Sequence, residues 1–123
     1  PTRTLIRAER AMRCSPFRLA LFLTMIYESV ALSTIAGQRG LQNQYTRQAL
    51  SELGSETELL WLIQVGLLRR EVDGQGLTDS FRVTPLGRQI VQKWQRPELA
   101  DHYPPTRRDR FYNFLNRWLR LPL

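Results

Sequence analysis

The chain has 123 residues, of which 42% are hydrophobic and 24% are charged, so it can bury one core of ordinary size and is not a disordered segment. Its single cysteine excludes an intramolecular disulfide framework and a cysteine-rich zinc site, and it indicates a reducing, cytoplasmic compartment. A formal net charge of +7 favours a polyanionic partner such as double-stranded DNA.

The positive charge belongs to the two ends of the chain. Residues 1–18 hold five arginines and one glutamate, and residues 107–120 hold five arginines and one aspartate, which gives +4 at each end. The 88 residues between them carry eight basic and nine acidic groups, which gives −1. Seventeen of the eighteen basic residues are arginine; this bias suits bidentate contacts with phosphate or carboxylate, and a G+C-rich genome would also produce it.

Two helices are predicted first. Thr4–Arg13 has apolar residues loosely on one side and arginines around the rest, so it forms a short helix or basic arm. Ser15 and Pro16 fit the N-cap and N1 positions of a second helix over Phe17–Tyr27, which is apolar on nearly every face. Such a helix lies in a domain core or in a membrane, and we favour the core because the later amphipathic helices need one.

The stretch Leu32–Leu53 predicts a helix-turn-helix. Ala36 permits close helix packing, and Gly40, four residues later, can adopt the left-handed conformation that turns the chain. A second helix is then expected over Leu41–Leu53, where apolar residues recur near the helical period. Its outward face would hold amides, which suit adenine, and arginine, which suits guanine or phosphate. An ordinary helix pair with a solvated polar face is the alternative.

A further helix and a hairpin follow. Ser55–Val65 is almost wholly apolar, and its first residue with Glu58 resembles a capping box. Side chains at residues 67–72 and 81–83 can alternate between the two faces of a strand. Residues 73–80 between these strands contain two glycines, so we expect a wing-like β-hairpin.

Thr84 and Pro85 fit the N-cap and N1 positions of the next helix. The strings GLLRRE at residues 66–71 and FRVTPLGRQIV at residues 81–91 resemble the wing and the following helix of winged-helix transcriptional regulators of the MarR and PadR type. The resemblance covers Ser15–Gln95 and implies a mainly α fold with a small β-hairpin, a winged helix-turn-helix with added N- and C-terminal helices. The expected parts are a basic N-terminal arm or helix (1–14), the winged-helix domain (15–95), and a Pro-containing linker with a basic amphipathic C-terminal helix (96–123).

The helix at Ser55–Val65 departs from the compact winged-helix pattern, in which the recognition helix leads directly into the first wing strand. Either Gln42–Leu53 reads DNA, or the later helix does. We prefer the first arrangement, because the later helix begins with Glu56 and Glu58, whose carboxylates repel phosphate.

The resemblance implies a DNA-binding protein, and specifically a dimeric transcriptional regulator. Arginines would position the phosphates, and the polar face of the second helix would read bases. The candidate DNA-binding residues are Arg39, Asn43, Gln44, Arg47, Gln48, Ser51, Arg69, Arg70 and Arg82. The alternative is a protein-protein or membrane-surface adaptor without DNA-binding activity, which the near-neutral middle of the chain favours.

Thr106 and Asp109 can cap a final helix that has apolar residues on one face and arginines largely on the other. We expect the apolar face to dock on the core or on a second copy of the chain in a homodimer, rather than on a membrane. The candidate dimerisation residues are Leu5, Met12, Phe111, Phe114, Leu115, Trp118 and Leu119.

Catalysis is not expected. The sequence has no Gly-rich phosphate loop, metal-ligand spacing or Ser/His/Asp arrangement, so we predict no enzyme activity, no cofactor and no metal site. The lone His102 has no second histidine or cysteine nearby and is expected to be a solvated loop residue.

Overall fold

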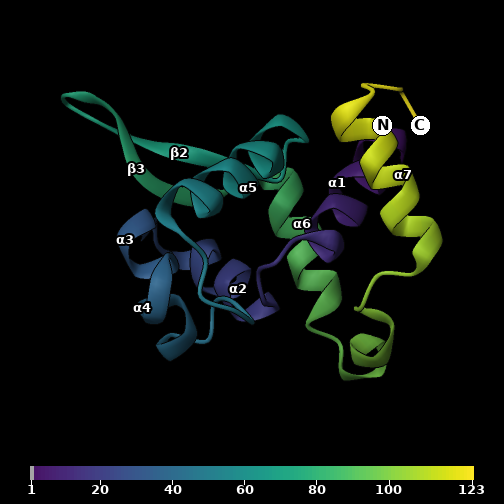
Figure 1. Ribbon diagram of the computed structural model, residues 1–123, viewed down its shortest axis with the longest axis horizontal. Coiled ribbons are helices and arrows are strands. Elements are labelled where there is room, and N and C mark those ends of the chain that lie inside the picture. Colours follow the sequence, from purple (N-terminus) through teal and green to yellow (C-terminus); the bar gives the residue numbers. More distant parts are fainter. Residues whose placement is uncertain (1) are drawn as a thin grey trace.

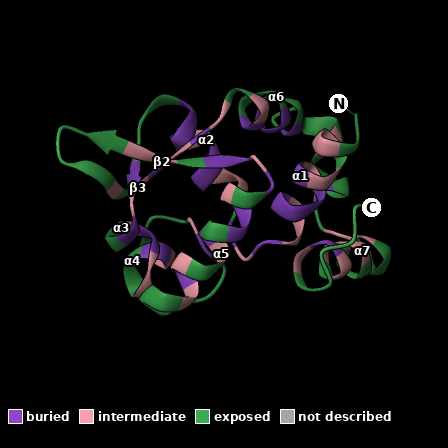
Figure 2. Cartoon of the chain, turned by 90° about the horizontal axis from the view of Figure 1, so that it is seen from above, coloured by how far each residue is buried: buried purple, intermediate pink, exposed green. Residues whose placement is uncertain are grey.

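Residues 2–123, which the computed structural model describes, form a mainly helical molecule with a small three-stranded antiparallel sheet (Figure 1). In chain order the elements are α1 (Thr2–Cys14), α2 (Leu19–Tyr27), β1 (Val30–Ala31), α3 (Leu32–Ile35), α4 (Gly37–Gln42), α5 (Glu52–Gln64), β2 (Leu68–Asp73), β3 (Gly76–Val83), α6 (Pro85–Trp94), the 3-10 helix η1 (Pro97–His102) and α7 (Arg107–Trp118). The first and last helices, α1 and α7, pack together at the end of the molecule away from the β2–β3 hairpin (Figure 1, Figure 2).

The apolar helix α2 lies at the centre of the core, where it packs against β3 and α6. Its fully buried side chains include Leu21, Phe22 and Met25. The helix begins later than predicted, because the Ser15 hydroxyl donates to the Met12 carbonyl and Phe17 pairs with Thr46 in an isolated β-bridge. Among the described residues, no helix combines the length and the apolarity that crossing a bilayer requires.

The sheet has the strand order β1-β3-β2, and its β2–β3 pairing confirms the predicted β-hairpin. Arg69 and Arg82 are direct cross-strand partners. The first strand of the hairpin, β2, is shifted by one residue from the prediction, whereas β3 is longer than predicted and begins at Gly76, whose φ of 109° suits glycine. The third strand, β1, pairs Val30 with Phe81, and it is too short to leave an alternating pattern in the sequence.

The threonine caps predicted for α6 and α7 are confirmed. Thr84 Oγ1 accepts a hydrogen bond from the Gly87 N–H at 3.0 Å. Thr106 Oγ1 accepts from the Asp109 N–H at 3.1 Å, and the Asp109 carboxylate accepts from the Thr106 N–H at 3.0 Å. A side chain at Gly87 would collide with the Leu67 carbonyl, so this glycine lets α6 approach the start of β2.

The helix predicted over Leu41–Leu53 is wrong. After α4 the chain runs through turns and extended backbone at residues 43–51 before α5 begins. Tertiary contacts hold this loop, because the Tyr45 carbonyl accepts from the Arg18 N–H at 2.8 Å and Thr46 is buried. Tyr45 and Leu50 of this loop pack against the core, whereas Leu53 is 74% exposed, so the helical period of the apolar residues does not mark the buried face of a helix.

Two further local predictions are corrected in the same region. The hydroxyl that caps α5 belongs to Ser51 and accepts from the Gly54 N–H at 2.9 Å, whereas Ser55 is fully buried inside the helix. The left-handed glycine is Gly37, with φ of 66°. Gly40 lies inside α4, where a side chain would collide with a carbonyl oxygen of α3.

Candidate interaction surfaces

The exposed face of α5 is acidic and apolar. Its exposed residues are Glu52, Leu53, Thr57, Leu60 and Gln64. Leu53 is 74% exposed, and the helix contains three glutamates and no basic residue. Such a face repels the phosphates of DNA and offers apolar contact instead.

Two of the three predicted wing arginines contact carboxylates of the same chain. Arg70 lies 3.0 Å from Asp79 and 3.7 Å from Glu56, and its side chain is only 16% exposed. Arg69 lies 3.1 Å from Glu71. The surface between α5 and the hairpin therefore offers little uncompensated positive charge.

Three arginines gather at the base of the hairpin, and we call them the arginine cluster. Arg69, Arg82 and Arg88, from β2, β3 and α6, line a shallow pocket of about 340 Å³. The guanidinium groups of Arg82 and Arg88 both donate to the Ile26 carbonyl at 3.3 Å, which brings two cations together. The described residues that line this pocket include no carboxylate, and although Arg69 is paired with Glu71, Arg82 and Arg88 can still accept an anion such as phosphate.

The residues of this stretch that were predicted to contact DNA lie on α4 and in the loop after it rather than along one helix. The exposed ones are Arg39, Asn43, Gln44, Arg47, Gln48 and Ser51. Gln44 has a left-handed φ of 62°, and the Asn43 amide donates to the Thr34 carbonyl at 3.0 Å. Ser51 uses its hydroxyl to cap α5. Their contact with DNA stays a prediction, but they cannot enter a groove together as one helix face.

A groove of about 760 Å³ lies between the end of α1, the loop before α5, α5 itself and α7. Its lining combines the apolar Leu50 and Leu53 with the guanidinium groups of Arg47 and Arg110. Cys14 also lines it; burial raises the pKa of this thiol to about 11, so the thiol stays protonated near neutral pH. Sequence reasoning missed this groove, because it depends on how α7 packs.

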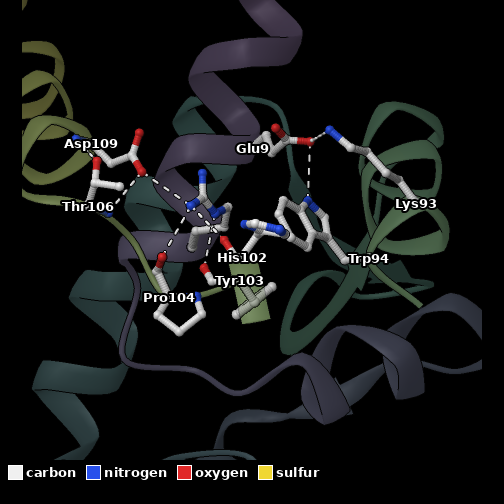
Figure 3. A network of polar contacts seen from close by, with 9 residues as sticks. Glu9, Lys93, Trp94, His102, Tyr103, Pro104, Thr106 and Asp109 are labelled. Atoms are coloured by element: carbon white, nitrogen blue, oxygen red, sulfur yellow. Dashed lines mark hydrogen bonds and ion pairs between the residues drawn. The ribbon is translucent and has the colours of Figure 1, made fainter. Parts of the chain in front are cut away.

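Arg13, which also lines the groove, connects the segment before α7 to α1. On the same helix, Glu9 accepts hydrogen bonds from Lys93 and Trp94 of α6 (Figure 3). Arg13 donates to the carbonyls of His102 (2.9 Å), Tyr103 (3.0 Å) and Pro104 (3.2 Å) and lies 3.2 Å from Asp109. Burial opposes ionisation of Asp109, but the Thr106 N–H and the Arg13 guanidinium outweigh it and hold the pKa of this carboxyl below its usual range. Arg13 therefore has a structural role.

The polar side of α7 faces the rest of the molecule, so the apolar face does not dock on the core; its predicted docking on a second copy stays a prediction. Its inward contacts are Arg10 with Asn116 (2.5 Å), Trp61 with Asn113 (3.1 Å) and Arg117 with Glu58 (2.8 Å). The physical reason lies in α1 and α5, which present polar groups that are costly to bury without partners. Burial lowers the pKa of Arg10, and this guanidinium donates hydrogen bonds to Asn116 of α7 and to the Leu123 carbonyl beyond it.

Four large apolar side chains at α7 point outward instead, and we call them the apolar stripe. They are Phe111 (59% exposed), Phe114 (51%), Trp118 (60%) and Leu119 (57%). Leu115, predicted for the same face, is half-buried. The prediction of Met12 as an interface residue is wrong, because Met12 is fully buried in the core, and Leu5 packs against that core.

Comparison with known protein families places the chain. A family model described as Npun_F0494-like matches residues 1–117, which is nearly the whole sequence. The chain belongs to the Npun_F0494-like family. The expected membership of the MarR and PadR regulators is therefore wrong, because the hairpin and Thr-Pro helix that suggested it are local turn and cap signals that unrelated families can share. No curated protein and no solved structure matches this Npun_F0494-like chain.

Proposed function

We propose that this chain is a winged-helix protein that acts by binding a partner surface through α7, rather than by reading DNA bases with a helix. The order α2, β1, α3–α4, α5, β2, β3 and the sheet order β1-β3-β2 support the winged-helix assignment, with α1 and α7 as added helices. In such a domain the helix before the hairpin, α5, takes the recognition position. This is the second of the two arrangements that the sequence allowed.

The observation that carries the proposal is the outward position of the apolar stripe. Contiguous exposed apolar side chains are unusual on a monomeric protein and mark a surface that meets a partner. Aromatic residues are also the type most enriched where such contacts concentrate their binding free energy. The polar contacts behind α7 fix its orientation, so the stripe cannot turn inward without leaving the buried Arg10 and Trp61 groups without partners.

The charges around α5 support the same conclusion. A base-reading helix must come within contact distance of phosphates, and α5 would bring the carboxylates of Glu52 and Glu56 to them. The nearby Arg70 cannot offset this repulsion, because its charge is already compensated by Glu56 and Asp79. Specific readout would fall to Thr57 and Gln64, the two uncharged polar side chains exposed on α5.

The test is selection of bound fragments from random duplex DNA, followed by measurement of affinity over a salt series. We expect weak, salt-sensitive binding from the net charge of +7 and no enriched sequence motif. The control is Gln92→Ala, at an exposed position of α6. The proposal would be overturned by an enriched motif that the Thr57→Ala/Gln64→Ala variant no longer selects and the control still does.

A second candidate keeps double-stranded DNA as the partner and places the contact at the arginine cluster. The convergence of Arg82 and Arg88 on one carbonyl favours phosphate binding there. Under this candidate, an Arg82→Ala/Arg88→Ala variant should lower the logarithmic salt slope of DNA binding by roughly 1 to 2. The matched control is Arg3→Ala/Arg96→Ala, which removes two exposed arginines from α1 and from the start of η1. Equal slopes in the two variants would remove this candidate.

A further inference from the structure

The outward side of α7 combines apolar and cationic groups in a defined arrangement. Phe111, Phe114 and Trp118 recur at three- and four-residue spacing and therefore share one side of the helix. Beyond the helix, Leu121 (43% exposed) and Leu123 (42% exposed) add two more exposed apolar side chains. Figure 2 shows exposed residues alternating with half-buried ones along α7 and an exposed C-terminal segment, at the end of the molecule opposite the hairpin.

The first turn of α7 holds Arg107, Arg108 and Arg110, all exposed. Cations at a helix N-terminus oppose the helix dipole, so this placement costs stability in the isolated protein. The one acid of the turn, Asp109, is occupied by the Thr106 N–H and by Arg13. Arg110 lines the groove described above, whereas Arg107 and Arg108 have an unfavourable position that an external anion would relieve.

Charge complementarity distinguishes between the possible occupants of this face. A second copy of the chain would bring either the same arginines or the face of α5, where Glu56 and Glu58 are already paired with Arg70 and Arg117. An anionic lipid bilayer provides both an apolar acyl-chain region for the apolar stripe and headgroup phosphates for the arginines. The side of α7 that lies on the protein is polar, so the helix is held flat with its aromatic residues outward, which is the orientation that an interfacial helix needs.

We infer that α7 binds the surface of anionic lipid bilayers, with the apolar stripe inserted at the headgroup level and the first-turn arginines on lipid phosphates. This inference rests on the proposed role of α7 in binding a partner surface and names the chemistry of that surface. It is a surface contact, in agreement with the finding that no helix within residues 2–123 is suited to span a bilayer. Trp is well placed for such a contact, because its ring prefers the membrane-water interface.

The fluorescence of Trp118 can report on this contact without an added label. Trp61 and Trp94 are 8% and 6% exposed, whereas Trp118 is 60% exposed. The full chain is mixed with vesicles of pure phosphatidylcholine or of equal parts phosphatidylcholine and phosphatidylglycerol, and bound protein is measured by sedimentation and tryptophan emission. We expect binding and a blue shift with the anionic vesicles only, reduced by added salt. In Trp118→Phe the blue shift should be lost while sedimentation with vesicles remains.

Exposed aromatic residues provide matched variants that leave the core intact. Phe111→Ser/Phe114→Ser should weaken binding to anionic vesicles by at least about tenfold, because two rings no longer insert. Arg107→Gln/Arg108→Gln should remove most of the preference for anionic over neutral vesicles. Tyr27→Ser, which removes an exposed aromatic ring outside α7, should bind as the unchanged chain does.

Three outcomes would overturn the inference: equal binding to neutral and anionic vesicles, unchanged binding of the Phe111→Ser/Phe114→Ser variant, or burial of Trp118 that depends on protein concentration without lipid. The last outcome would identify a second copy as the occupant and would leave the proposed partner-binding role of α7 standing. An enriched DNA motif read by α5 would overturn that role independently of the vesicle result.

Discussion

The two ends of this molecule use their charged side chains in different ways. Around the hairpin and α5, Arg70 contacts Asp79 and Glu56, so charge of both signs is compensated at the surface. Around α1 and α7, Arg10 and Arg117 turn inward to Asn116 and Glu58, and the helix then exposes its apolar side together with other arginines. The comparison teaches that net charge alone does not locate a binding surface, because internal partners decide which charges remain available.

The largest expected effect tests the inward contacts of α7. Asn116→Ala leaves the buried Arg10 guanidinium without its side-chain acceptor, and we expect a loss of about 2 kcal/mol in the free energy of unfolding. Urea denaturation measures this loss, and Gln92→Ala on the exposed side of α6 provides the control. A change equal to that of the control would mean that the polar side of α7 is not held against α1.

An intermediate effect concerns the start of the same helix. The pKa of Asp109 is held below its usual value, so its ionised form stabilises the fold above the unfolded pKa, and this contribution is lost as the pH falls through the folded pKa. Asp109→Asn should cost about 1 kcal/mol near neutral pH through the lost capping box. The gap between the two proteins should narrow below about pH 4. A gap that stays constant with pH in denaturation curves would contradict this role of the carboxylate.

The smallest expected effect concerns the hairpin end. Glu56→Gln/Asp79→Asn removes the two carboxylates beside Arg70 and should raise affinity for random duplex DNA by roughly threefold, with a slightly steeper salt slope. The matched control is Glu98→Gln/Asp101→Asn, which removes two exposed carboxylates of η1 and changes the net charge equally. If the affinity for DNA rises equally in both variants, net charge governs binding and the pairing of Arg70 with its carboxylates has no effect on it.

The sequence predicted those elements whose signals are local. Thr84 with Pro85, and Thr106 with Asp109, specify helix starts through contacts within four residues, and both starts were predicted correctly. The hairpin was also predicted, because its strands are joined by a short glycine-containing turn. Local chemistry determines these features almost alone.

The rest depends on contacts between distant residues. The segment at residues 43–51 is a loop and not a helix because it is held by contacts with the chain before α2, and no short-range pattern reveals those contacts. The apolar period of α7 correctly indicated one apolar side, but it could not indicate which side meets the core. The orientation of α7 is set by its polar contacts with Arg10, Trp61 and Glu58, which α1 and α5 place next to it.

The central claim is that α7 presents its apolar stripe to the outside, and the most direct test is the accessibility of Trp118 in the lipid-free protein. The difference between the emission of the unchanged chain and that of Trp118→Phe isolates this indole from the buried Trp61 and Trp94. At low protein concentration we predict a water-like emission maximum and strong quenching by acrylamide. A blue-shifted emission that acrylamide does not quench, unchanged on further dilution, would place the stripe inward and contradict the account.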